Sequence, residues 1–223
     1  MNKFLILGSG ISGSTAGLEL AELGHQVELI ESTSLFGGKV LDYCCKATDE
    51  CSKCGACVAH TQIHNAVIHP SIHLTTGAVI DSVANTGTKV TLQLQRKNPA
   101  IDYHKCTGCG ECVDVCPQNC ITEYRRGEIV EYAIDYNTCL LHQGEECHAC
   151  VNACPHGAVE ANGPVTRQTL TGDGILIATG HEPFNAERKP RYGYERLRKV
   201  FTGAEAEQML THEGGEGLQR FLR

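Results

Sequence analysis

The sequence predicts an α/β fold that is interrupted by two cysteine-rich insertions. Three observations support this prediction. Residues 4–30 read as strand, glycine-rich turn, helix and strand; all 14 cysteines lie between residues 44 and 154; and the apolar stretch GDGILIATG follows them at residues 172–180. The 223 residues suffice for one substantial core, or for a larger domain that carries a small module, so the sequence leaves both domain counts open.

The first element is a short apolar strand at residues 4–7, which leads into Gly8, Gly10 and Gly13 in the pattern G-x-G-x-x-G. In such a turn the first glycine permits the sharp reversal, the second lets the backbone approach a pyrophosphate, and the third allows the helix to pack closely on the strand. The helix expected at residues 12–23 points its positive end at that pyrophosphate. This order of elements predicts a dinucleotide site, whereas the glycine pattern alone would also fit an ordinary α/β turn.

The second strand is expected at residues 27–30, and Glu31 follows it at the position where an acidic residue bonds ribose hydroxyls. Two features favour FAD over NAD. Gly37 and Gly38 resemble the paired glycines that many flavoproteins place against the FAD pyrophosphate, and the Ala-Thr-Gly of residues 172–180 resembles the strand that returns to the sheet in those proteins. We therefore predict a Rossmann-like FAD-binding domain, with candidate contacts at Gly8, Gly10, Ile11, Ser12, Gly13, Glu31, Ser32, Gly37, Gly38, Lys39, Val79, Ala178, Thr179 and Gly180.

Residues 106–117, CTGCGECVDVCP, have the cysteine spacing C-x2-C-x2-C-x3-C-P of bacterial ferredoxins. A second run at residues 139–155, CLLHQGEECHACVNACP, repeats this arrangement with a longer first gap. In such proteins the fourth cysteine of each run binds the cluster of the other run. We therefore predict an inserted bacterial-type 2[4Fe–4S] ferredoxin module, with one cluster on Cys106, Cys109, Cys112 and Cys154 and the other on Cys139, Cys147, Cys150 and Cys116. Zinc sites seldom need eight cysteines in this order.

A further cysteine-rich insertion lies upstream, in DYCCKATDECSKCGACVAH at residues 42–60. Its last three cysteines repeat the two-residue gaps of a ferredoxin run, which favours a third [4Fe–4S] cluster. We assign this cluster to Cys45, Cys51, Cys54 and Cys57, with Cys44 as the alternative to Cys45.

Other interpretations of the cysteines remain open. A tetrahedral zinc site could use Cys51, Cys54, His60 and His64, although it would leave Cys57 unexplained. A redox-active cysteine pair next to the flavin is a further alternative. Cys120 is surplus to both ferredoxin sets, and we interpret it as a buried thiol that packs as a small hydrophobic side chain.

Between the cysteine-rich regions, residues 69–95 alternate between polar and apolar side chains around turns, which predicts a β-meander. The expected organisation is the first half of the FAD-binding domain at residues 1–41, a cysteine-rich cluster insertion at 42–66, the β-meander at 67–97, the ferredoxin module at 98–160, and the returning strand with a C-terminal tail at 161–223. A short helix is expected in this tail at residues 203–210.

Composition excludes several function classes. A net charge of −7 with only 19 lysines and arginines provides no basic surface for nucleic-acid phosphates. No apolar run approaches the roughly 18 residues of a membrane helix, and the N-terminus reaches its glycine-rich turn too soon for a secretory signal.

We expect a cytoplasmic protein, because thiols stay reduced there and dense cysteines then bind metal clusters. No catalytic triad, P-loop or carboxylate pair is apparent, so we assign no catalytic residue.

Together these motifs resemble the A-type subunit of heterodisulfide reductase and its relatives, including that of sulfur-oxidising heterodisulfide-reductase-like complexes. The resemblance covers essentially the whole chain. It rests on GSGISGSTAG, GGKV before the cysteine cluster, HPSIHL, both ferredoxin runs, ILIATG and KPRYGYERLRKVFTGAEAEQML. It implies an FAD-containing iron–sulfur subunit of a soluble complex, whose partners are B-type and C-type subunits and which associates as a homodimer.

The resemblance also implies an oxidoreductase subunit that passes electrons among FAD, the clusters and its partners. The residues do not decide between sulfur oxidation and electron bifurcation, and we favour sulfur oxidation. Flavin domains of this kind usually continue beyond the Ala-Thr-Gly strand. We therefore expect the chain to be a fragment or short variant, or a partner to complete the flavin site. Two other function classes stay open: a non-catalytic ferredoxin-like carrier or scaffold with an empty flavin site, and a zinc-stabilised interaction protein.

Overall fold

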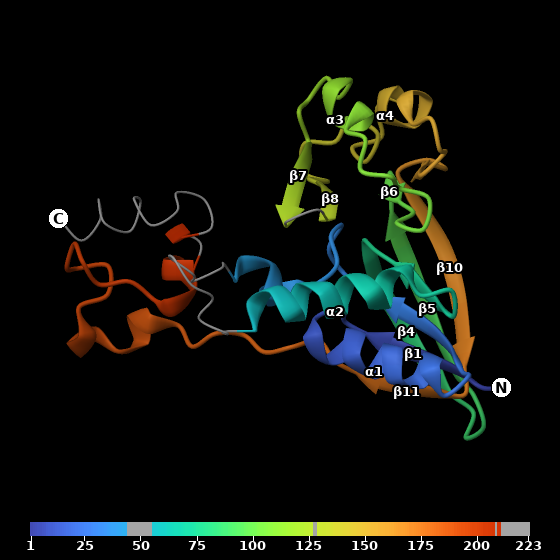
Figure 1. Ribbon diagram of the computed structural model, residues 1–223, viewed down its shortest axis with the longest axis horizontal. Coiled ribbons are helices and arrows are strands. Elements are labelled where there is room, and N and C mark those ends of the chain that lie inside the picture. Colours follow the sequence, from blue (N-terminus) through green and yellow to red (C-terminus); the bar gives the residue numbers. More distant parts are fainter. Residues whose placement is uncertain (44–54, 127–128, 208, 211–223) are drawn as a thin grey trace.

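The computed structural model describes residues 1–43, 55–126, 129–207 and 209–210. In this part of the chain a layered α/β unit carries a smaller cysteine-rich module, and a C-terminal tail extends from the α/β unit (Figure 1). The structure thus confirms the predicted fold class, an α/β domain with an inserted module.

The central layer is a parallel sheet of four strands in the order β11-β1-β2-β3. Strand β1 (Lys3–Leu7) pairs with β2 (Gln26–Ile30) on one side and with β11 (Gly174–Ile177) on the other, while β3 (Ile72–Thr75) extends the sheet beyond β2. The predicted return of residues 172–180 to the first sheet is therefore confirmed. The carboxyl ends of these strands meet at one edge, where ligands bind in folds of this type.

Helices α1 (Ile11–Glu22) and α2 (Ala56–Ile68) form the layer on one face of this sheet. Each helix turns a stripe of apolar side chains toward the strands, as its helical spacing requires. The buried residues of this core include Ile6, Leu18, Ala21, Val27, Leu29, Ile63, Ala66, Val67 and Ile72.

Helix α2 corrects the predicted extent of the cysteine-rich insertion at residues 42–66. Most of α2 falls within that range, yet its Ile63 and Val67 are 2% and 0% exposed and belong to the core of the dinucleotide-binding unit. The physical reason is topological, because two adjacent parallel strands, here β2 and β3, need a crossover connection that is usually a helix. The insertion therefore gives way to this crossover helix at residue 56.

The opposite face of the parallel sheet packs against an antiparallel sheet in the order β10-β5-β4. It consists of β4 (Ala78–Asn85), β5 (Val90–Lys97) and β10 (Val165–Gly172). Leu5 and Ile30 face this sheet, whereas Ile6 and Leu29 face the helices, because successive side chains of a strand point to opposite faces.

The predicted β-meander at residues 67–97 is correct only for its hairpin. Strands β4 and β5 form that hairpin, but β3 leaves it for the parallel sheet, and β10 supplies the third antiparallel strand. The alternating pattern of residues 69–95 identifies strands without identifying their sheet. The sheet of β3 is determined by the preceding helix α2, which that pattern does not include.

The cysteine-rich module is inserted between β5 and β10, whose ends at Lys97 and Val165 pair with each other. It contains two short antiparallel pairs and two short helices: β6 (Ala100–Ile101) with β9 (Val159–Glu160), β7 (Ile121–Arg126) with β8 (Ile129–Ile134), α3 (Glu111–Asp114) and α4 (Ala149–Ala153). Its core combines cysteines with apolar side chains from the β7–β8 hairpin.

Tyr103 joins the module to the α/β unit, because its side chain packs against the cores of both. Its hydroxyl donates to the carbonyl of Tyr132 at 2.8 Å and to that of Ser34 at 3.2 Å, and its ring meets Phe36 edge-on at 4.7 Å. A second tie runs from the Ile134 amide to the Ser34 hydroxyl at 3.0 Å. The loop after β2 is therefore bonded directly to strand β8 of the module.

We expect Tyr103→Phe to lower the free energy of unfolding of the whole chain by about 1 kcal/mol, because the ring stays and only the hydroxyl bonds are lost. Urea unfolding followed by far-UV circular dichroism and by cluster absorption should show the same shift in both signals. Tyr136→Phe is the matched control, since the Tyr136 hydroxyl is buried without a hydrogen-bond partner among the described residues. A shift in only one signal would contradict the joining role of Tyr103.

The C-terminal tail begins after β11 and includes the short 3₁₀ helices at Ala186–Arg188 and Pro190–Tyr192. Residues 203–207 and 209–210 are helical, as predicted for residues 203–210. Thr202 and Glu205 form a capping box at the start: the Glu205 carboxylate accepts from the Thr202 amide at 2.6 Å, and the Thr202 hydroxyl accepts from the Glu205 amide at 3.2 Å. In the described part of the chain, no helix has the length and apolar character needed to span a bilayer.

Candidate functional site

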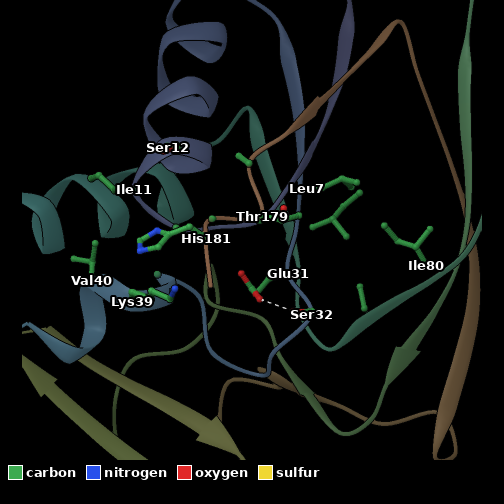
Figure 2. Close-up of a pocket in the computed structure, with 18 of the residues that line it drawn as sticks. Leu7, Ile11, Ser12, Glu31, Ser32, Lys39, Val40, Ile80, Thr179 and His181 are labelled. Atoms are coloured by element: carbon green, nitrogen blue, oxygen red, sulfur yellow. Dashed lines mark hydrogen bonds between the residues drawn. The ribbon is translucent and has the colours of Figure 1, made fainter. Parts of the chain in front are cut away.

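A cavity of about 430 Å³ lies at the carboxyl ends of β1 and β2. Its walls come from the glycine-rich turn, from the end of β2, from the loop and 3₁₀ helix at Gly38–Asp42, and from residues 178–181 after β11. Figure 2 shows Glu31 near the middle of the view, with Lys39 and His181 on one side of it and Ile80 on the other. The volume falls within the range of ordinary cofactor pockets.

The glycine-rich turn can form only because two of its glycines lack a side chain. Gly8 has φ +101°, and a Cβ on it would lie 2.4 Å from the carbonyl oxygen of Ala178. A Cβ on Gly13 would lie 1.9 Å from the carbonyl oxygen of Gly8. Gly10 differs, because it lines the cavity and its nearest neighbour, the Gly37 oxygen, would be 3.9 Å away. Gly8 and Gly13 therefore have the crowded surroundings expected of the first and third glycines, and Gly10 leaves the cavity wall without a side chain.

The Gly37-Gly38 turn lies directly against the first glycine-rich turn. The Gly37 amide donates to the Ser9 carbonyl at 3.1 Å, and a Cβ on Gly38 would come within 3.4 Å of the Gly10 Cα. Both glycines line the cavity. Two backbone turns with little side-chain bulk thus form one wall of the cavity, which suits close approach to a pyrophosphate.

Glu31 is held in place at the cavity by donors from this chain. Its carboxylate accepts from the Ser9 amide at 3.0 Å, from the Ser9 hydroxyl at 2.7 Å and from the Thr33 amide at 3.0 Å. Burial by itself raises the pKa of Glu31, but the hydrogen bonds from Thr33 and Ser9 outweigh it and lower the pKa below its ordinary value of 4.5. The carboxylate is therefore ionised and fixed in orientation at neutral pH.

We expect Glu31→Gln to lower the free energy of unfolding by about 1–3 kcal/mol at neutral pH, because it leaves buried donors without their charged acceptor. The pKa of Glu31 is lower in the folded than in the unfolded chain. Its carboxylate therefore stabilises the fold above about pH 4.5, and this contribution is lost as the pH falls through the folded-state pKa.

The difference in the free energy of unfolding between the two proteins should thus stay constant near neutral pH and narrow as the pH falls below about 4.5. Glu19→Gln, an exposed carboxylate on α1, is the control and should stay within about 0.5 kcal/mol of the parent protein. A gap that is independent of pH would contradict the assigned role of the ionised carboxylate.

Twelve of the predicted dinucleotide contacts line the cavity, and two do not. Gly13 contributes through its packing against Gly8 instead. The assignment of Val79 is corrected: Ala78 and Ile80 face the cavity, so Val79 between them on β4 points the other way and is 47% exposed. The sequence interpretation missed the lining residue His181, although it directly follows the predicted Gly180.

The first cysteine cavity lies between α3, β8 and β9 in the inserted module. Its lining contains Cys106, Cys109 and Cys112 from the first run and Cys154 from the second. Tyr132 also lines this cavity, and its hydroxyl donates to the Gly108 carbonyl at 2.9 Å. The structure thus gathers the four cysteines that the crossed arrangement predicts.

The second cysteine cavity gathers the reciprocal set, Cys139, Cys147 and Cys150 from the second run and Cys116 from the first. Cys120, which was predicted to be a surplus buried thiol, is 6% exposed but also lines this cavity. Within the described residues, no three His, Cys, Asp or Glu side chains converge on one point that could hold a single metal ion. The cysteines of each set line one common cavity, as the ligands of a multi-iron cluster would.

The sulfur of the fourth cysteine in each run accepts a hydrogen bond from the backbone amide four residues later. The Cys120 amide donates to the Cys116 sulfur at 3.4 Å, and the Ala158 amide donates to the Cys154 sulfur at 3.2 Å. Burial opposes ionisation of Cys116 and Cys154, but such backbone donors lower the pKa of each below its ordinary value. At Cys112 burial dominates and raises the pKa to about 11.

The predicted third cluster cannot be followed as a whole, because Cys44, Cys45, Cys51 and Cys54 lie outside the described residues. Cys57 is exposed in the first turn of α2. Of the histidines in the zinc alternative, His60 bonds the Val40 carbonyl through Nε2 at 2.6 Å, and His64 lies 3.5 Å from a Glu131 carboxylate oxygen.

Two sequence families match the two parts of the chain. The NAD(P)-binding Rossmann-like domain matches residues 6–68, and the 4Fe–4S dicluster domain matches residues 105–164. The second range contains the cysteines that line both cysteine cavities, and the first contains the glycine-rich turn, Glu31 and helix α2.

Curated relatives cover nearly the whole chain. The A subunit of ferredoxin:CoB-CoM heterodisulfide reductase from Methanosarcina acetivorans is 29% identical over 94% of this chain and 28% of its own length. The A subunit of H(2):CoB-CoM heterodisulfide,ferredoxin reductase from Methanothermobacter marburgensis is 28% identical over 96% of this chain and 33% of its own. An iron–sulfur A subunit of CoB–CoM heterodisulfide reductase from Methanopyrus kandleri is 30% identical over 96% of this chain and 33% of its own length.

The chain therefore spans about a third of the length of these relatives. Among solved structures, the flavoprotein disulfide reductase RclA of Escherichia coli aligns with 91% of this chain and 26% of its own at 13% identity, with a TM-score of 0.33. That TM-score is too low to support a conclusion about this chain, whereas the sequence relatives agree with one another. Over 94–96% of its residues, the chain is similar in sequence to the A subunits of heterodisulfide reductases.

Proposed function

We propose that the chain is an electron-transferring oxidoreductase subunit that holds one FAD and at least two [4Fe–4S] clusters. The observation that carries this proposal is the gathering of cysteines from both runs around two cavities, in a module bonded directly to the dinucleotide-binding unit. A bound flavin exchanges electrons in pairs, and an iron–sulfur cluster exchanges them singly. Together they convert between two-electron transfer and one-electron transfer.

In this proposal the large cavity holds the ADP half of FAD. Gly10, Ile11 and Ser12 stand at the N-terminal end of α1, where backbone amides and the helix dipole favour a pyrophosphate. Glu31 would accept hydrogen bonds from ribose hydroxyls, and its fixed negative charge disfavours a ribose that carries a phosphate. Paired glycines at Gly37 and Gly38 favour FAD over NAD.

The crossed cysteine sets would hold the two clusters, with Cys106, Cys109, Cys112 and Cys154 at the first and Cys116, Cys139, Cys147 and Cys150 at the second. A third cluster on Cys57 and the cysteines upstream of it is part of the proposal. Its support is the repeated two-residue spacing of Cys51, Cys54 and Cys57.

We also propose that the protein works in the cytoplasm as a homodimer with B-type and C-type partner subunits, in a complex that oxidises sulfur compounds. The names of the relatives, A subunits of heterodisulfide reductases, support partner subunits, and the cysteine content suits a reducing compartment. Sulfur oxidation rests only on the resemblance to the A-type subunits of sulfur-oxidising complexes. Purification of the tagged chain from its own cells, followed by mass spectrometry and light scattering, tests the partners and the dimer.

The cofactor content of protein purified without oxygen tests the central part of the proposal. We expect one FAD per chain with about twelve irons and equal acid-labile sulfide for three clusters, or about eight for two. Clusters without flavin would reduce the protein to a ferredoxin-like carrier. Zinc in place of iron, without acid-labile sulfide, would contradict the proposal.

A further inference from the structure

The two cysteine cavities are related by an internal repeat that differs at one chemically important position. After the fourth cysteine of each run, the sequence reads CPQNC at residues 116–120 and CPHGA at residues 154–158. Both segments form the same turn. Asn119 has φ 50° and Gly157 has φ 60°, and each donates its amide to the carbonyl of the cysteine three residues earlier, at 3.2 and 3.3 Å. Cys120 therefore occupies the place that Ala158 has in the other half.

These equivalent residues have the same packing environment. Ala158 is 2% exposed and lines the first cavity, and Cys120 is 6% exposed and lines the second. Both donate their amide to the sulfur of the preceding fourth cysteine. Since a methyl group fills this position in one half of the module, packing does not require a thiol in the other half.

The extra thiol lies against a proposed cluster ligand. The sulfur of Cys120 is 3.4 Å from the sulfur of Cys116, which is within hydrogen-bonding range for sulfur atoms. Five thiols thus line the second cavity, although a [4Fe–4S] cluster takes four cysteine ligands. Cys116 is the ligand of this pair, because its counterpart Cys154 is a cysteine, whereas the counterpart of Cys120 is an alanine that cannot bind iron.

We propose that the Cys120 thiol donates a hydrogen bond to the sulfur of Cys116 and thereby raises the reduction potential of the second cluster. A hydrogen bond to a ligand sulfur stabilises the more negatively charged reduced cluster, which makes reduction easier. Because Ala158 provides no such donor to Cys154, the thiol makes the two halves of the module unequal. This inference rests on the proposed function, since it requires that the module holds two clusters.

The difference in reduction potential determines which of the two clusters an electron prefers. With similar cavities and backbone donors at both sites, an electron shared between the clusters resides preferentially at the second, next to Cys139, Cys147 and Cys150. A thiol is a weak donor, so the expected bias is modest. We expect up to about a tenfold change in the equilibrium constant for one-electron exchange between the clusters, which corresponds to about 59 mV.

Redox titration of the full chain, followed by electron paramagnetic resonance, tests this assignment. In Cys120→Ala, iron and sulfide content should match the parent protein while the potential of one cluster falls. Cys120→Ser keeps a donor and should restore most of that potential. The reciprocal variant Ala158→Cys places a thiol beside Cys154 and should raise the potential of the other cluster.

Two outcomes would overturn the inference and leave the proposed function standing: unchanged potentials in Cys120→Ala at full iron content, or loss of about four irons in that variant, which would make Cys120 a ligand. Absence of iron and sulfide from the parent protein would overturn the proposed function, and the inference with it. Because the cofactor content of the parent is measured first, these two failures are distinguished.

Discussion

Gly13→Ala is expected to lower the free energy of unfolding by about 3 kcal/mol or more and to abolish flavin binding. The added Cβ would lie 1.9 Å from the carbonyl oxygen of Gly8. Gly8 lies in the turn after β1 and Gly13 in the first turn of α1, so neither can move without displacing the helix from the sheet. Urea unfolding and the flavin content of the purified variant measure the two effects.

Gly10→Ala is the matched control for this experiment. Gly10 has φ −68°, and its added Cβ would meet only the Gly37 oxygen, at 3.9 Å. The fold should therefore keep its stability within about 0.5 kcal/mol, while the methyl group at the cavity wall weakens flavin binding. Equal destabilisation by both variants would contradict the separate roles assigned to the two glycines.

Paired cysteine substitutions should reveal that the cluster ligands cross between the two runs. Cys106 and Cys154 line the same cavity although they come from different runs, so replacing both with alanine should remove about four irons per chain. Cys139 and Cys154 come from the same run but line different cavities, so replacing both should remove about eight. Iron and acid-labile sulfide analysis of the two double variants gives the answer.

An uncrossed arrangement makes the opposite prediction. The Cys139 and Cys154 double variant would then lose about four irons, and the Cys106 and Cys154 double variant would lose about eight. The single variant Cys120→Ala is the control for cysteine replacement in this core, because it removes a buried thiol that is surplus to both sets. It should keep all of its iron.

The elements that the sequence predicts correctly are those whose signals are local. The strand, turn, helix, strand and acid of residues 4–31 form a continuous pattern, and each part is determined by neighbours within a few residues. The cysteine spacing carries a long-range prediction as well, because the cluster geometry of ferredoxins determines which distant sulfurs must meet. The crossed sets therefore follow from the two ferredoxin-like runs.

The errors and omissions arise where non-local packing determines the structure. The sequence analysis does not predict helix α2, because the N-terminal part of this helix carries a cysteine of the ferredoxin-like spacing. Its core residues are therefore assigned to the cysteine-rich insertion. Strand β3 alternates like its neighbours, but its sheet is determined by that helix. Tyr103 shows no sequence signal, since its role arises only where the inserted module meets the loop after β2.

The most direct test of the electron-transfer account is a flash-reduction experiment on the intact chain, loaded with its cofactors under exclusion of oxygen. A short light pulse reduces the flavin through an external photoreductant, and absorbance then follows the flavin and the clusters separately. The account predicts that electrons move from flavin to clusters at a rate independent of protein concentration, because both sites belong to one bonded unit. A rate proportional to protein concentration, or no transfer, would contradict it.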